Sequence, residues 1–214
     1  MTCRKCPRLV RWREESARRP PRRFSGESYW ARPVSAFGDP EARLLLVGLA
    51  PAAHGGNRTG RVFTGDRSGD FLFAALHAVG LANRAESVRA GDGLALSGAL
   101  LTAACRCAPP GNKPLPREFK NCRPFLLREI ALLSPGSVLV ALGALAFGAI
   151  LVSLSEAGHA IPRPRPRFAH GCHVRIGPFA VFGSYHPSQQ NTFTKRLTQP
   201  MLRSVLRRAL AAIS

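Results

Sequence analysis

Apolar residues of this chain gather in four short runs that alternate with longer segments of helical periodicity. The runs are continuous and bounded by Gly, Pro or Ser; they cover residues 42–49, 96–104, 137–142 and 179–185. Such runs are typical of buried parallel strands, which are covered on both faces. Apolar positions at helical spacing predict helices over residues 68–79, 116–133, 144–157 and 199–213.

Strand alternating with helix predicts an α/β fold, a three-layer α/β/α sandwich around a mostly parallel four-stranded sheet. Residues 1–214 then form a single domain with no internal repeat of useful period. A Pro- and Arg-rich stretch, residues 18–23, and an irregular segment precede the first strand. We therefore expect residues 1 to about 40 to form an arm. Ligands of such sheets bind beyond the carboxyl ends of the strands, where residues 48–66 and 184–196 form unusual loops.

The charge balance points to a polyanionic partner. Lys and Arg number 31 against 12 Asp and Glu, a formal net charge of +19, and the excess lies in the blocks 4–23, 163–175 and 195–208. Blocks of this kind bind nucleic acid through phosphate contacts. The alternative is an Arg-rich composition that is merely solvated.

Neither a membrane span nor a secretory signal is visible in the sequence. The longest apolar stretch, residues 137–154, is interrupted by Gly143 and Gly148, and the first residues are basic without an apolar segment. We therefore expect a cytosolic protein that does not span a membrane.

Cysteine spacing suggests a metal site. Disulfides are rare in cytosolic proteins, so six cysteines favour metal or redox chemistry over cross-links. One pair forms C-x2-C followed by Pro7, and a second pair stands fifteen residues apart; the four positions are Cys3, Cys6, Cys107 and Cys122. An iron-sulfur cluster and a Zn(Cys)4 site both fit these residues, and inert buried thiols are the alternative. Cys105 and Cys172 are interpreted as ordinary small residues.

The loop after the first strand is rich in small residues. Gly48, Ala50 and Ala52 would let the main chain approach a flat ligand closely, and Phe63 would offer a stacking face. A lone glycine-rich loop can equally well be a set of turns beside a core phenylalanine.

The loop after the last strand carries a histidine at the strand end. His186 is followed by Pro187, Ser188 and Asn191 and then by a basic stretch. A histidine in this place is a candidate for stabilising negative charge on a leaving group, although a single His before Pro is often structural.

Three motifs in this order give the sequence a family resemblance. They are G-L-A-P-A-A-H-G-x-N-R-T-G-R-x-F-T-G-D from residue 48, C-x-P-P-G-N-K-P-x-P from residue 107 with Cys122 beyond it, and H-P-S-x-x-N from residue 186. The chain resembles the uracil-DNA glycosylase superfamily, and most closely its iron-sulfur branch, family 5 or type B. The resemblance implies a monofunctional hydrolase that flips uracil, and other deaminated bases such as hypoxanthine, out of DNA in base excision repair. It also implies a structural [4Fe-4S] cluster on Cys3, Cys6, Cys107 and Cys122. By the same resemblance we expect a monomer in a bacterial or archaeal cytoplasm, associated with the nucleoid and not with a membrane.

The resemblance assigns roles within the two loops. His186 would stabilise the departing base, and Asp66 and Asn112 would orient the attacking water, because Ala50 stands where many relatives carry Asp or Asn. Asp66 could instead cap a helix and Asn112 shape a turn. The expected substrate contacts are Gly48, Ala50, Ala52, His54, Asn57, Phe63, Ser188 and Asn191. His54 and Asn57 are also alternative candidates for orienting the attacking water. The expected DNA contacts are Arg58, Arg61, Gln189, Gln190, Lys195 and Arg196.

Ala50 also bears on the substrate range. Buried polar groups reject wrong ligands strongly and apolar walls reject them weakly, so a pocket with Ala50 should accept several bases. The competing hypothesis is a non-catalytic nucleic-acid-binding module held together by an iron-sulfur or zinc site. Such a module would bind DNA with its full affinity if His186 were replaced. A protein that binds a nucleotide phosphate at Gly48 is disfavoured because neither G-x-G-x-x-G nor a Walker motif is present.

Overall fold

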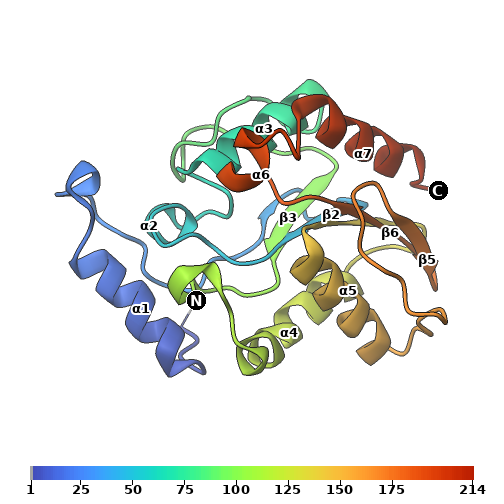
Figure 1. Ribbon diagram of the computed structural model, residues 1–214, viewed down its shortest axis with the longest axis horizontal. Helices are drawn as coiled ribbons and strands as arrows, with labels where there is room; N and C mark the ends of the chain where they lie inside the picture. Colours follow the sequence, from blue (N-terminus) through green and yellow to red (C-terminus); the bar gives the residue numbers. More distant parts are fainter. Residues whose placement is uncertain (1) are drawn as a thin grey trace.

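The computed structural model describes residues 2–214, so Met1, the first residue of the expected arm, lies outside the described residues. Its centre is a six-stranded sheet in the order β1-β3-β2-β4-β6-β5 (Figure 1). The strands are β1 (Phe37–Gly38), β2 (Leu44–Gly48), β3 (Ala99–Ala103), β4 (Val138–Leu142), β5 (His173–Ile176) and β6 (Phe179–Ser184). The four predicted strands form its parallel centre, β3-β2-β4-β6.

The expected number of four strands is wrong, because a short antiparallel strand lies at each edge. β1 pairs with β3 over only two residues. β5 pairs with β6, and its polar residues His173 and Arg175 are exposed. Edge strands often carry such basic side chains and lack an apolar run, which is why the hydrophobic pattern did not reveal them.

Alternate side chains of the central strands feed two separate cores. Leu44 and Leu46 of β2 pack into one apolar cluster, and Leu45 and Val47 pack into the other. This follows from the two-residue period of a strand, which sends successive side chains to opposite faces. Because both faces are covered, all five residues of β2 and of β4 are buried.

Helices cover both faces of the sheet and complete the predicted three layers. Figure 1 shows α3 and α7 over one face and α4 and α5 over the other. These four helices match the helical patterns closely; their bounds are α3 (Arg67–Ala78), α4 (Pro116–Ala131), α5 (Ala144–Glu156) and α7 (Gln199–Ala211). Among residues 2–214, no helix combines the length and hydrophobicity that crossing a bilayer requires.

The arm contains a helix that the sequence pattern did not predict. α1 (Pro7–Arg18) lies beside the carboxyl ends of the strands (Figure 1), and the short helical turn η1 (Arg22–Phe24) follows it. Arg8 of α1 donates hydrogen bonds to both carboxylate oxygens of Glu118 in α4, at 2.9 and 2.8 Å. α1 is thus held by polar contacts with distant residues as well as by the buried side chains of Leu9 and Val10.

Short helical segments complete the loops at this end of the sheet. They are α2 (Gly56–Thr59), η2 (Pro110–Asn112) and α6 (Gln189–Phe193). Each belongs to one of the three motifs, so the motifs meet beyond the carboxyl ends of the parallel strands, as the sheet topology predicts.

Candidate active site

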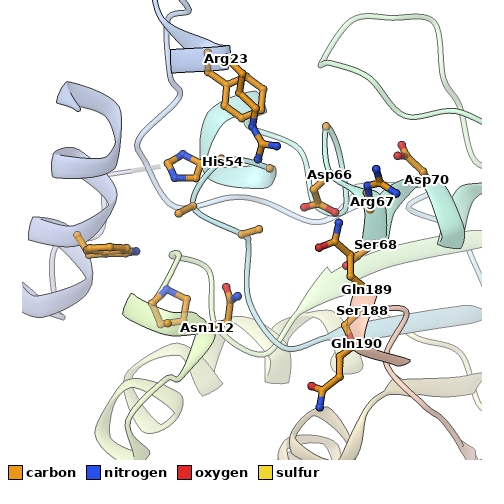
Figure 2. Close-up of a pocket in the computed structure, with 18 residues that line it drawn as sticks. Arg23, His54, Asp66, Arg67, Ser68, Asp70, Asn112, Ser188, Gln189 and Gln190 are labelled. Atoms are coloured by element: carbon orange, nitrogen blue, oxygen red, sulfur yellow. The ribbon is translucent and has the colours of Figure 1, made fainter. Parts of the chain in front are cut away.

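A continuous cleft opens where the three motifs meet. Its inner part is a pocket of about 360 Å³ and its outer part a cavity of about 700 Å³. In Figure 2, His54 and Asn112 lie across the outer opening from Asp66, Ser68 and Gln189. The residues shared by the two parts are Ala52, Asp66, Ser68, Gly111, Asn112, Ser188 and Gln190.

The inner pocket is apolar on its sides. The walls are formed by Leu49, Ala50, Pro51, Val62, Phe63 and Ala103. Polar groups stand at its ends: His186 from the last strand, and Asp66, Asn112 and Ser188 toward the cleft. A flat ring with polar edges fits such a space, because the walls can cover its faces while the ends meet its polar atoms.

Phe63 is held in an unusual backbone conformation beside Gly48. Its φ is 50°, a left-handed value that is rare for aromatic residues and typical of functional sites. A Cβ added at Gly48 would lie only 2.5 Å from Cε2 of Phe63, so only glycine allows the ring this close to β2. Gly48 therefore positions the pocket wall and does not itself line the pocket.

His186 lies at the inner end of the pocket and faces Phe63. The two ring centroids are 5.8 Å apart with an interplanar angle of 32°. Burial lowers the pKa of His186 to about 4, so its imidazole is neutral at physiological pH. Neither ring nitrogen bonds to another residue of the described chain, whereas the backbone carbonyl of His186 accepts a hydrogen bond from Asn191 Nδ2 at 2.8 Å. The imidazole is thus free to donate one hydrogen bond into the pocket.

Asp66 caps a helix and also lies at the cleft. Its Oδ1 accepts the backbone N–H of Gly69 at 3.0 Å, which makes it the N-cap of α3. It also lines both parts of the cleft. A Cβ at Gly55 would lie 2.0 Å from Oδ2, so the carboxylate is pressed against that glycine. Burial raises the pKa of Asp66, which increases its affinity for a proton.

Asn112 and Ser68 complete the polar edge of the cleft. Asn112 has a left-handed φ of 56°, lies exposed in η2, and lines both parts of the cleft. Ser68, in the first turn of α3, lines both parts as well. The sequence analysis missed Ser68, although its place two residues after Asp66 put it on the same helix start.

Three expected substrate contacts are placed differently by the structure. Asn57 is 1% exposed and donates to the backbone carbonyl of Arg13 in α1, at 3.1 Å, so it ties the arm to the loop and does not reach the pocket. The amide of Asn191 donates its hydrogen bond to the backbone carbonyl of His186. His54 lies in the outer cleft, where its Nδ1 is 3.0 Å from the Tyr29 hydroxyl, and is therefore remote from the inner pocket.

Arg61 and Arg58, which were expected to contact DNA, are used in contacts within the protein. Arg61 is 5% exposed and bonds to both carboxylate oxygens of Asp92, at 2.9 and 2.6 Å, so its charge is used inside the protein. Arg58 is mostly buried and pairs with Glu27 at 2.6 Å. Both arginines brace the first loop. The remaining expected DNA contacts are exposed, and the first two of them line the cleft: Gln189, Gln190, Lys195 and Arg196.

The four motif cysteines gather at one place beside α1. Cys3, Cys6, Cys107 and Cys122 all line one small cavity between the arm and α4. The pKa of the Cys6 thiol is raised by burial, with smaller contributions from the nearby Cys122 and Cys3. All are free thiols, and no group of His, Cys, Asp or Glu side chains within residues 2–214 is arranged to hold a single metal ion. β3 ends at Ala103, so Cys105 and Cys107 follow the strand and do not lie on it.

A buried arginine adjoins this cysteine cluster. Arg13 is 2% exposed and donates from Nη1 to Cys107 Sγ at 2.9 Å and from Nη2 to the carbonyl of Cys3 at 3.3 Å. Its Nε is buried without a partner, and no ion pair within residues 2–214 includes Arg13. Asn121 donates to Cys6 Sγ at 3.3 Å. A buried cation of this kind is costly unless an anion lies beside it.

Comparisons with known proteins agree with the motifs. Residues 35–210 match the family model of the uracil DNA glycosylase superfamily. The chain is 53% identical over 209 residues to a type-5 uracil-DNA glycosylase of Mycobacterium bovis, covering 97% of this chain and 76% of that protein. A protein of the same description from Thermus thermophilus is 53% identical over 97% of this chain and 92% of its own length. A type-5 uracil-DNA glycosylase of Pyrobaculum aerophilum is 47% identical, over 99% of this chain and 89% of its own length.

Proposed function

The chain belongs to the uracil DNA glycosylase superfamily, and from this membership and the geometry of its cleft we propose how it acts on DNA. It is a hydrolase of N-glycosyl bonds that excises uracil from DNA. The apolar inner pocket with His186 at its end is the observation that carries the mechanism, because a flipped base fits between such walls. The base would stack on Phe63, with its polar edge toward His186.

His186 stabilises the departing base. Cleavage of the bond between the base and the sugar leaves its electron pair on the base, so negative charge develops on a base oxygen. The neutral imidazole donates a hydrogen bond to that oxygen without carrying a charge into the apolar pocket. The low pKa of His186 favours this uncharged donor at neutral pH.

Asp66 orients and deprotonates the attacking water. As the base leaves, the sugar becomes an oxocarbenium-like cation and water adds to its anomeric carbon. The proton released by the water passes to Asp66, whose raised pKa suits a general base. Asn112, across the cleft, holds the water from the other side (Figure 2).

Water is the nucleophile in this proposal, and the enzyme is monofunctional. A lyase would need a lysine amine at the sugar. The residues that line the inner pocket offer Asp66 and His186 for proton chemistry, and no lysine of the described chain is among them. The product is an abasic site for later steps of base excision repair.

The pocket walls support a broad range of bases. Ala50 lies on the wall, and the other sides are formed by apolar residues such as Leu49, Val62 and Ala103. Apolar surfaces discriminate weakly among rings of similar size. We therefore extend the substrate range to other deaminated bases, hypoxanthine among them.

We propose that a [4Fe-4S] cluster is held by four cysteine side chains, those of Cys3, Cys6, Cys107 and Cys122. Two features of the chain fit this group. The four thiols line one cavity, and Arg13 places an otherwise uncompensated buried charge against Cys107, as an anionic set of thiolates requires. When bound, the cluster supplies cross-linking between the arm and α4 rather than chemistry at the base. Arg13 neutralises the thiolates, and its carbonyl bonds to Asn57 of the first loop.

Excision from defined oligonucleotides tests the proposal. Purified protein is incubated with end-labelled duplexes containing uracil or hypoxanthine, and alkali then cleaves the abasic sites. We expect strand breaks at both bases, and none at thymine. Cleavage of uracil without cleavage of hypoxanthine would refute the proposed breadth, and breaks formed without alkali would refute monofunctional hydrolysis.

A further inference from the structure

The outer part of the cleft offers more room than one flipped base needs. It adds about 700 Å³ to the inner pocket, and one of its walls comes from the arm: Trp12 of α1 and Arg23 and Phe24 of η1. The opposite wall includes Arg67 and Gln189 (Figure 2). Because the two cavities share Asp66, Ser68 and Asn112, a ligand in the outer part would be directly connected to the base in the inner part.

The indole of Trp12 lines this cavity and is free to stack on a ligand. Its side chain is half-buried, and neither an aromatic ring nor a guanidinium of residues 2–214 stacks on it. Its Nε1 is buried and has no hydrogen-bond acceptor in the described chain. The part of Trp12 that lines the cavity is therefore the carbon surface of the indole, which can stack on a flat ligand.

Charge in the same cavity favours a phosphate. Arg23 is exposed, stacks on Phe24 at 4.7 Å and forms no ion pair within residues 2–214. Arg67 also lines the cavity, although Asp70 lies near it and offsets part of its charge. An aromatic ring next to a free guanidinium is the combination by which proteins hold single-stranded nucleotides.

We propose that the outer cleft is a subsite for the nucleotide adjacent to the excised one. The neighbouring base stacks on the indole of Trp12, and Arg23 neutralises the adjoining phosphate. The enzyme then holds two unstacked nucleotides rather than one, and the arm is part of the substrate site. This inference rests on the proposed function only in that the substrate is DNA with a flipped base.

Removal of the neighbouring base tests the subsite directly. Excision is measured on single-stranded and duplex oligonucleotides in which the nucleotide 5′ or 3′ of uracil is a stable abasic analogue. For the wild-type protein we expect the abasic analogue on one of the two sides to raise KM about tenfold, the order of one base-aromatic stack. kcat should stay within about twofold, because the inner pocket is intact.

Trp12→Ala should lose that sensitivity. On ordinary uracil DNA its KM should rise by the same factor, and the abasic neighbour should cause no further increase. Trp12→Phe should retain part of the effect. Trp30→Ala is the matched control, since Trp30 packs against Gly60 outside the cavity and donates to the carbonyl of Pro33; it should keep the full sensitivity.

Fluorescence supplies a second readout on folded protein. The chain has two tryptophans, so Trp30→Phe leaves Trp12 as the only one. DNA with an intact neighbour should quench its emission, and DNA with the abasic neighbour should not. The subsite is refuted if the wild type excises uracil with equal KM from all these oligonucleotides, or if Trp12→Ala remains sensitive to the missing base. Absence of excision from every oligonucleotide would instead refute the function itself.

Discussion

Replacing Arg13 by methionine should affect the protein in opposite ways with and without the proposed cluster. Arg13 is 2% exposed and contacts Cys107 Sγ at 2.9 Å. With thiolates beside it, the guanidinium is paired. With protonated thiols, it is a buried charge without an anion.

The expected magnitudes follow from these two states. In the cluster-loaded protein, Arg13→Met removes a hydrogen bond to a charged acceptor, so the free energy of unfolding should fall by about 2–3 kcal/mol. In the cluster-free protein the same change removes an uncompensated charge and fills its place with an apolar chain. It should then cost nothing, or stabilise by about 1–4 kcal/mol.

Urea unfolding of both forms measures the difference. The cluster-free form is prepared by oxidation and chelation, and the iron content of each sample is determined. Arg11→Met is the control, because Arg11 is exposed on the same helix and should change neither form appreciably. Equal destabilisation of both forms by Arg13→Met would show that Arg13 acts through packing alone, and the counter-ion argument would fail.

Three further results are expected. Gly48→Ala should lower the excision rate at least tenfold without preventing folding, because the added Cβ would lie 2.5 Å from Cε2 of Phe63 and would displace the ring. A normal rate would mean that the ring does not cover the base. Burial lowers the pKa of His186 from 6.5 to about 4, so the unfolded chain binds this proton at a higher pH than the folded protein does. The contribution of the neutral His186 to stability should therefore be present above pH 6.5 and be lost as the pH falls from 6.5 to 4. Urea unfolding at several pH values measures this loss. Arg61→Gln should lower the free energy of unfolding by about 3–5 kcal/mol, because it leaves Asp92 unpaired, but it should not change the salt dependence of DNA binding; a smaller salt slope would return Arg61 to the DNA surface.

The central fold could be predicted because its strands are buried on both faces. Residues 44–47 and 138–142 are apolar at every position, and a central parallel sheet covered on both faces buries such runs. The edge strand β5 escaped notice because His173 and Arg175 alternate with apolar residues over only four positions. Short, half-exposed strands carry too few apolar residues to be distinguished from a loop.

The site was predictable where chemistry depends on local sequence. His186 was placed at a strand end from its own sequence surroundings, whereas Asp66 was assigned to the site through the family resemblance, and both line the inner pocket. Asn57 and Arg61 were misjudged because their partners, Arg13 and Asp92, lie 44 and 31 residues away. No local pattern shows that a polar side chain in a loop will be buried by a distant segment.

The contribution of the arm could not be predicted for the same reason. Pro7–Arg18 has a polar sequence, and its helix is placed by contacts with Glu118 and with the first loop. The wall that Trp12 and Arg23 add to the cleft follows from that docking.

Single-turnover excision by His186→Ala tests the central claim most directly. The rate and the dissociation constant are measured separately on a uracil duplex, beside the wild type. We expect the rate to fall about 10²–10³-fold, as for the loss of one donor to a developing anion, while the dissociation constant stays within about twofold. A variant that binds the same DNA and excises uracil at the wild-type rate would contradict the account.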